Sequence, residues 1–276
     1  MNQQILYLFT RTPLHVGAGA SVGAVDQPVQ RERHTGFPVI PGSSIKGVLA
    51  DTGDYADVSK DDNRSELGHK LFGRGAGKEK GDSGSAGGIS IAEAQLLAFP
   101  VRSARGCFAW LTSPLCLARW SRVSGVSLPD ISDPSEGQAL FDGEVLGHDG
   151  KALFEDYVFN HEASFPAAEA LAGIAVDGIW ADLAEKHLVL VSDDILSHFA
   201  RHACEVAQHV VIDNETGTAK NGLLFNQENV PAETLFFATI SATKDPKLLK
   251  ELNVPNPIQL GGDATTGLGF CSSNLV

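Results

Sequence analysis

The stretch that decides the fold runs from Thr12 to Gly47 and reads TPLHVGAGASVGAVDQPVQRERHTGFPVIPGSSIKG. It holds a glycine-rich loop, one isolated aspartate, a dense cluster of cations, and a turn that carries two serines and a lysine. Glycines and the first N–H groups of a helix let a backbone approach phosphates closely. The grouping is therefore typical of a surface that binds phosphates and holds one carboxylate beside them.

Apolar runs on either side of this stretch predict a mixed α+β fold. Ile5–Thr10 indicates a first strand that is buried on both faces. Ser43 is expected to be the N-cap of a helix. A stripe of apolar residues at helical spacing predicts a second helix from Ser192 to Val210. Residues 125–150 are rich in glycine, proline and aspartate, and this composition predicts a loop.

We interpret the chain as one domain, residues 1–276, with three excursions. Residues 52–88 contain a run rich in glycine and charge, and we expect a flexible insertion there. Residues 122–180 are interpreted as a second insertion. Turn residues at Asn214–Gly217 predict a hairpin excursion over residues 210–232.

The charge balance argues against a free-standing nucleic-acid binder. The chain has 34 acidic and 21 basic residues, which gives a net charge of −13, and its pI is about 5.0. Binding to phosphates needs local lysine and arginine rather than a favourable total. Much of the acid is clustered in residues 51–62 and 130–144, so one basic face inside a larger assembly remains compatible with the composition.

The four cysteines, Cys107, Cys116, Cys204 and Cys271, do not have the CxxC spacing of a zinc site. The chain opens without a charged and apolar leader. No apolar run approaches the ~20 residues needed to cross a bilayer. We therefore expect a cytoplasmic protein with no membrane partner.

The quoted stretch resembles the RAMP superfamily of CRISPR proteins, and within it the repeating backbone subunit of the type III-B (Cmr) effector complex. Further blocks follow in the same order along most of the chain. These blocks are Leu96–Arg102, Gly106–Pro114, Leu188–His198, Leu223–Phe236 and the glycine-rich Gly261–Phe270. Only the insertions around 52–88 and 122–180 are not covered by the resemblance.

The resemblance implies a modified ferredoxin-like (RRM-like) palm with a protruding thumb hairpin and finger insertions. It implies that several copies stack into a helical filament along a CRISPR guide RNA, together with the other subunits of the complex. The thumb of each copy would push apart one base pair of the guide–target duplex. The single-stranded target RNA would then be cut at regular intervals in a reaction that needs Mg²⁺ or Mn²⁺ and uses the RNA's own 2′-hydroxyl.

By the same resemblance, Asp26 is the residue on which cleavage depends, and its carboxylate would also hold the metal ion. A loop aspartate that only caps a turn is the alternative. His15 could move a proton or bond the guide backbone. Relatives often carry an acid two residues before a tyrosine where this chain has Gln227-Glu228-Asn229. Glu228 is the residue that could substitute for that acid.

The remaining candidates would contact RNA. Lys46 follows two serines at a helix start, which together make an anion site. Arg31 and Arg33 alternate with other residues, and this predicts an extended segment with one face on RNA or on a neighbouring subunit. Solvated surface positions are the alternative for these cations. The full set of expected RNA contacts is Lys46, Ser43, Ser44, Arg31, Arg33, Gly17, Gly19, Gly261, Gly262, Thr265, Thr266 and Gly267.

Two other functions stay open from the sequence. One is a filament subunit that holds the guide–target duplex without cutting it, and the other is a stand-alone RNA-processing nuclease of the same superfamily. His198 and His202 have the i, i+4 spacing of a metalloprotease helix. Phe199 stands where such a motif has glutamate, so we interpret these histidines as ordinary helix residues.

Overall fold

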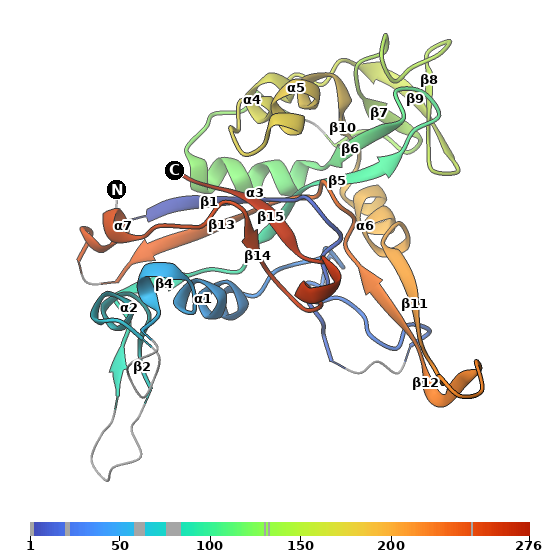
Figure 1. The fold of residues 1–276 in the computed structure, drawn as a ribbon. Helices are drawn as coiled ribbons and strands as arrows, with labels where there is room; N and C mark the ends of the chain where they lie inside the picture. The colour runs from blue at the N-terminus through green and yellow to red at the C-terminus, as the bar shows by residue number, and fades with distance from the viewer. Residues whose placement is uncertain are drawn as a thin grey trace.

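The centre of the fold is strand β1 (Gln3–Thr10), which is hydrogen-bonded along both of its edges. A computed structural model describes residues 3–19, 23–57, 64–75, 84–129, 131, 133–243 and 245–276. In it, β13 (Leu235–Ala242) and β15 (Phe270–Leu275) pair with β1 antiparallel, one on each side. Figure 1 shows these three strands across the middle of the molecule. The predicted first strand is thereby confirmed.

The sheet continues outward from this centre on both sides. Its strand order is β14-β15-β1-β13-β5-β6-β10-β7-β9-β8, and β4 pairs with β13 beside this path. The additional strands are β4 (Ile89–Ile91), β5 (Gln95–Arg102), β6 (Phe108–Thr112), β7 (Gln138–Leu140), β8 (Lys151–Phe154), β9 (Tyr157–Ala163), β10 (Leu188–Leu190) and β14 (Ile258–Gln259). Most neighbours are antiparallel, whereas the pairs β6–β10 and β7–β9 are parallel. The mixed pairing and the helices between strands agree with the predicted α+β class.

Each face of the sheet is covered by its own hydrophobic core. Leu6 and Leu8 of β1 belong to one core, and the alternate residues Ile5, Tyr7 and Phe9 belong to the other. Because successive side chains of a strand point to opposite faces, a strand covered on both sides must be apolar at every position. This explains the continuous apolar run that marks β1 in the sequence.

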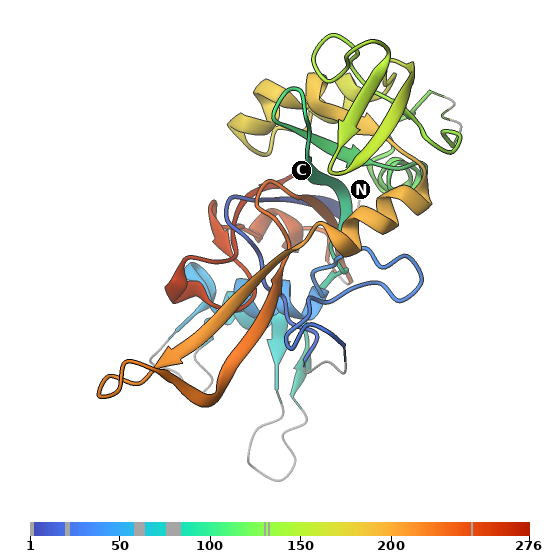
Figure 2. The ribbon, with the colours of Figure 1, turned by 90° about the vertical axis from the view of Figure 1, so that its right-hand side faces the viewer.

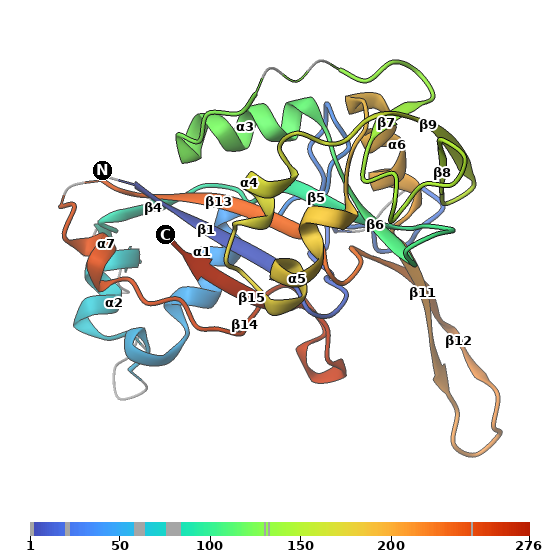
Figure 3. The same cartoon turned by 90° about the horizontal axis from the view of Figure 1, so that it is seen from above.

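Helices supply the cover on both faces, as Figures 1 and 3 show. The first core includes side chains of α1 (Gly42–Ala50), α2 (Glu66–Phe72) and α6 (Asp193–His202). The second core includes side chains of α3 (Pro114–Ser124), α4 (Ala168–Ala172) and α5 (Gly178–His187). The short helix α7 (Leu248–Glu251) follows β13.

The two predicted insertions contain regular structure. Within 52–88 the chain forms the 3₁₀ turn η1 (Gly53–Tyr55), α2, and the small hairpin of β2 (Gly73–Arg74) and β3 (Ser85–Ala86). The rest of the expected flexible segment, residues 58–63 and 76–83, lies outside the described residues.

The insertion at 122–180 carries β7, β8, β9 and α4, and α5 begins at its end. The predicted loop at 125–150 is therefore wrong in part, since β7 lies inside it. Buried Ala139 and Phe141 explain the difference, because they attach this segment to the first core.

Strands β11 (Glu205–Ile212) and β12 (Ala219–Asn229) form a separate two-stranded hairpin that extends away from the sheet (Figures 2 and 3). We call it the thumb hairpin. It begins at Glu205, not at residue 210 as predicted, and α6 ends at His202. Val206 and Val210 therefore lie on a strand rather than on a helical stripe. Pairing with β12 outweighs their helical spacing, and β-branched residues favour strands.

The second core predicts a large effect of truncating Phe9. Its ring packs edge-on against Trp110, at 6.1 Å between centroids, and against Trp180, at 5.9 Å. Phe9→Ala should lower the free energy of unfolding by about 3–5 kcal/mol, because the cavity lies between rigid rings. Urea denaturation measures this. Val206→Ala on the exposed thumb is the control and should stay within about 0.5 kcal/mol of the unmutated protein.

Candidate nucleic-acid interface

The two glycine-rich segments, which lie at opposite ends of the chain, meet at His15. The N–H of Gly262 donates to the His15 carbonyl at 2.9 Å, and the N–H of Gly269 donates to the Pro13 carbonyl at 2.9 Å. Gly261 has φ +78°, and a Cβ at this position would clash with the His15 carbonyl. Only glycine fits there without strain. The structure therefore brings the predicted residues of both segments together.

A groove of about 570 Å³ runs beside this junction, and we call it the palm groove. It is lined by Val16, Gly17, Ser43, Ser44, Gly47, Val48, Asp51, Thr52 and Gly261. Four of the expected RNA contacts thus line one concave surface, although they come from three separate segments. Lys46 lies half-buried on the same helix and does not line the groove.

The other expected glycine and threonine positions lie on the exposed surface near the groove. The C-terminal segment holds Gly262 and the turn η2 (Ala264–Thr266), which Gly267 ends with φ +88°. The Thr266 hydroxyl donates to the Asp263 carbonyl at 2.9 Å. Thr265 is exposed, as is Gly19 at the other end of the junction.

Helix α1 presents its N-terminus to the palm groove. The helix begins at Gly42 after Pro41, so the prediction that Ser43 is the N-cap is wrong. Pro41 fixes the extended conformation that precedes the helix, and Ser43 becomes the second helical residue. The first turn contains no acidic residue. Its free N–H groups and two serine hydroxyls thus favour an anion.

The loop that carries Asp26 is attached to the base of the thumb hairpin. We call this base the thumb root, and it comprises Cys204–Glu205, where the chain enters β11, and Asn226–Asn229 at the end of β12. Gln27 pairs with Gln227 of β12 in parallel orientation. The Gln27 N–H donates to the Asn226 carbonyl at 3.0 Å, and the Glu228 N–H donates to the Gln27 carbonyl at 2.9 Å. The Asn226 N–H donates to Oδ2 of Asp26 at 2.8 Å. The Asp26 side chain is exposed, so a fixed carboxylate faces solvent at the root of the thumb.

His15 contacts the same root through Glu228, two residues further along β12 than Asn226. It is only 8% exposed, and its Nδ1 lies 2.7 Å from the Glu228 carbonyl. Because a carbonyl only accepts, Nδ1 carries the hydrogen, and Nε2 of the neutral ring is the acceptor. The ring packs against Gly17, where a Cβ would lie 2.9 Å from Nε2. Asp26 and His15 are therefore both hydrogen-bonded to the last residues of β12.

Arg31 and Glu228 lie beneath this surface as a buried ion pair, with Nη2 and Oε1 2.5 Å apart. The other carboxylate oxygen of Glu228 accepts the Val29 N–H at 3.0 Å. Both side chains bond to groups inside the protein. These bonds argue against the predicted RNA contact by Arg31 and the predicted catalytic role of Glu228, and both roles stay predictions. The extended alternation expected through Arg33 is wrong, since the chain turns at 33–35 and leaves Arg33 exposed.

Sequence reasoning missed a second connection at the thumb root. The buried Gln227 amide donates from Nε2 to Oδ2 of Asp263 at 2.7 Å and to Oδ1 of Asn229 at 3.2 Å. It thereby ties β12 to the C-terminal glycine-rich segment. The only signal in the sequence is that Asp263 is the single charged residue within that run of glycines and threonines.

At the thumb root, a metal ion would have the single Asp26 carboxylate as a ligand rather than a complete set of protein ligands. The described part of the chain contains no group of three or more His, Cys, Asp or Glu side chains that could hold a metal. Mg²⁺ is commonly held by one or two carboxylates and completed by water and substrate phosphates. The exposed Asp26 carboxylate fits such a hydrated ion.

His198 and His202 stack on each other at 4.4 Å, and Nδ1 of His202 bonds the His198 carbonyl at 2.8 Å. This local bond within one turn of α6 agrees with our interpretation of both as ordinary helix residues.

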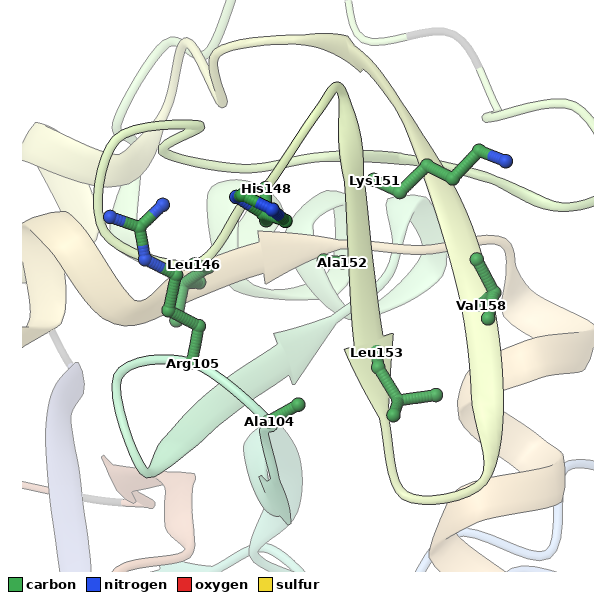
Figure 4. Close-up of a pocket in the computed structure, with 8 residues that line it drawn as sticks. All are labelled: Ala104, Arg105, Leu146, His148, Lys151, Ala152, Leu153 and Val158. Carbon is green, nitrogen blue, oxygen red and sulfur yellow. The ribbon is translucent and has the colours of Figure 1, made fainter.

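A second concavity of about 460 Å³, which shares no lining residue with the palm groove, lies between the β5–β6 turn and the β8–β9 hairpin (Figure 4). Its floor is apolar, and Arg105, His148 and Lys151 are its basic residues. None of the residues predicted to act on RNA lines it. The palm groove and the thumb root therefore form the candidate site.

Together, the two-faced palm, the protruding hairpin and the closing glycine-rich segment define a RAMP-type protein. The chain belongs to the RAMP superfamily, whose family model matches residues 8–272. A curated relative is the CRISPR system Cmr endoribonuclease Cmr4 of Pyrococcus furiosus. It is 33% identical over 290 residues, which cover 100% of this chain and 96% of the relative. The resemblance inferred from the sequence is thereby confirmed.

Solved structures agree with this assignment. The crystal structure of oligomeric Cmr4 from Pyrococcus furiosus superposes with a TM-score of 0.73 at 28% identity and covers 100% of this chain and 98% of that one. A chain of the type III-B Cmr-beta complex bound to cognate target RNA gives 0.72 at 19% identity, with 99% and 96% covered, and shares the fold. The predicted RAMP palm is confirmed.

Within the described residues, no helix is long and apolar enough to cross a membrane.

The junction of the glycine-rich segments gives a matched pair of variants. Gly261 and Gly267 both have positive φ, but only Gly261 is closely approached by other atoms. Gly261→Ala should therefore lower the free energy of unfolding by at least about 1 kcal/mol more than Gly267→Ala does, since steric overlap adds to backbone strain. Chemical denaturation of both variants measures the difference, and equal losses would contradict the close approach.

Proposed function

We propose that this chain is the backbone subunit of a type III-B CRISPR effector complex and an RNA-guided endoribonuclease. It binds guide RNA, stacks on copies of itself beside the other subunits, and cuts the matched target RNA in the cytoplasm. The observation that carries the proposal is the Asp26 carboxylate, fixed by the Asn226 N–H and exposed at the thumb root. The name of the curated relative supports cleavage, and the oligomeric solved structure supports self-association.

Guide RNA lies along the palm groove in this proposal. The N-terminus of α1 and the hydroxyls of Ser43 and Ser44 bind phosphate oxygens, and Lys46 adds a positive charge. The glycines at the junction let the sugar–phosphate backbone come close. These contacts carry no base information, so the subunit accepts guides of any sequence.

The thumb hairpin separates bases of the guide–target duplex. Val210 is paired across the hairpin with Leu224, and their exposed fractions are 46% and 63%. Val206, also exposed, lies four pairs closer to the root, opposite Glu228. Apolar side chains that enter a base stack unstack neighbouring bases at a cost of a few kcal/mol. The nucleotide displaced in this way comes next to Asp26.

Cleavage then uses groups at the thumb root. The 2′-hydroxyl oxygen attacks the adjacent phosphorus, and the bond from phosphorus to the 5′ oxygen breaks. That 5′ oxygen takes a proton from water, so the products carry a 2′,3′-cyclic phosphate and a 5′-hydroxyl. Nε2 of His15, the unprotonated nitrogen, accepts the 2′-hydroxyl proton. Asp26 would hold a hydrated Mg²⁺ or Mn²⁺ ion, which would supply positive charge to the phosphate oxygens.

A non-catalytic filament subunit is the second candidate. Glu228, the acid that could support Asp26, is bonded to Arg31 and to the Val29 N–H. Asp26 is then the one carboxylate left for the reaction among these two acids, because Glu228 is held by other groups. This arrangement suits a subunit that positions the duplex and leaves cutting to other components.

Asp26→Asn separates the two candidates. Asparagine keeps an oxygen for the Asn226 N–H but loses the charge that would hold a cation. The variant complex should assemble and bind matched target normally, while cleavage falls by about 10²-fold or more. Gel analysis of end-labelled target in Mg²⁺ or Mn²⁺, with an EDTA control, measures this. Regular cutting at an unchanged rate would refute catalysis by Asp26, and no cutting by the unmutated complex would favour the filament subunit.

Lys46→Ala tests the guide contact. Guide retention should weaken to a similar degree for every guide sequence, and the slope of log affinity against log salt should fall by about one. Filter binding of the assembled complex over a salt series measures both. Lys247→Ala, which alters an exposed lysine before α7, is the control and should leave the slope unchanged. A loss that depends on guide sequence would mean that Lys46 contacts bases.

A further inference from the structure

We propose that Arg31 is a positioning residue that couples the root of the thumb hairpin to the loop that carries Asp26. The inference rests on the proposed cleavage by Asp26 and adds a residue that controls where its carboxylate lies.

The guanidinium of Arg31 contacts the end of α6, the residue before β11, strand β12 and its own loop. Its Nη1 donates to the carbonyls of Gly36, at 2.8 Å, and Ala200, at 2.7 Å. Its Nη2 donates to Sγ of Cys204 at 3.2 Å and to Oε1 of Glu228 at 2.5 Å. A planar guanidinium fixes the relative directions of its partners. Arg31 therefore sets how the end of α6, the chain that enters the thumb and β12 lie against the loop.

Glu228 extends this connection to the Asp26 loop. While Oε1 receives Arg31, Oε2 receives the N–H of Val29, three residues after Asp26. The pair thus holds the register in which residues 26–29 run beside β12. A shift in that register would remove the Asn226 N–H from the Asp26 carboxylate and move the carboxylate relative to the thumb.

Because the ion pair is buried, the geometry of the loop and the thumb root depends on both Arg31 and Glu228. The side chains of Arg31 and Glu228 are 18% and 10% exposed. Such pairs add little net stability, but removal of one partner leaves an uncompensated charge. The buried position also separates Arg31 from the exposed Arg33, which remains available to RNA. The pair is therefore suited to specifying one geometry.

Arg119 supplies a matched control. It donates from Nη1 to both carboxylate oxygens of Glu32, at 2.9 and 3.1 Å, and both side chains are largely buried. It holds the same loop to α3, but it makes no hydrogen bond or ion pair to the thumb among the described residues. A variant of Arg119 thus perturbs the loop without breaking the connection between loop and thumb.

Arg31→Lys and Arg119→Lys are compared in the assembled complex. A lysine keeps the charge but cannot reach partners in four directions. Arg31→Lys should slow single-turnover cleavage by about tenfold or more at saturating target, since small misplacements of a catalytic group are costly. Target affinity should stay within about twofold, and Arg119→Lys should change neither quantity beyond that. Equal cleavage losses in the two variants, or a salt-dependent loss of RNA binding by Arg31→Lys, would overturn the proposal.

Amide hydrogen exchange at Asn226 gives a readout that does not need cleavage. Arg31→Lys should speed this exchange, because the Asp26 carboxylate no longer holds the amide, whereas Arg119→Lys should not. Glu228→Gln keeps an acceptor for Val29 and should also speed exchange, so it replaces Arg31→Lys if that variant fails to assemble. Faster exchange at Asn226 in Arg31→Lys but not in Arg119→Lys, in a complex that never cuts RNA, would support the coupling and argue against the proposed function. Unchanged exchange at Asn226 would overturn the coupling itself.

Discussion

The antiparallel pairing of β1 with both β13 and β15 determines where the functional segments lie. Thr10 ends β1 opposite Cys271 at the start of β15, and Phe9 pairs with Leu235 at the start of β13. The loop after β1, the end of the thumb before β13 and the glycine-rich segment before β15 must therefore emerge at one end of the sheet. His15, the thumb root and Gly261 come together for this reason, although they are far apart in the chain.

Among the described residues, no lysine or arginine lines the palm groove. The palm groove is lined by glycines, serines and the start of α1, and it also includes Asp51. A surface built from N–H groups can bind phosphate without a large positive charge. This reconciles a net charge of −13 with the proposed RNA function. It also implies that the shape of the palm groove, more than the total charge of the protein, limits which RNA strands fit.

The sequence predicted those features that depend on local pattern. The run at Ile5–Thr10, the glycines near residues 17 and 261, and the isolated Asp26 are recognisable without a structure. The pairing of Arg31 with Glu228 is not, because residues 197 positions apart in the chain carry no local sign of contact. The end of α6 at His202 was missed for a related reason. Val206 and Val210 fit a helical stripe equally well until β12 is present to pair with them.

The thumb hairpin has a consequence for the free chain. Among the described side chains of the hairpin, five apolar ones are exposed, namely Val206, Val210, Val211, Ile212 and Leu224. Beyond its root, the described hairpin pairs with no other strand, so its edges can pair with other molecules. Repulsion between chains that each carry a charge of −13 opposes such contacts, and salt screens that repulsion. We therefore expect the unassembled chain to stay dispersed at low ionic strength. In the proposed complex, RNA would cover the hairpin and so keep its apolar side chains and free edges from associating with other chains.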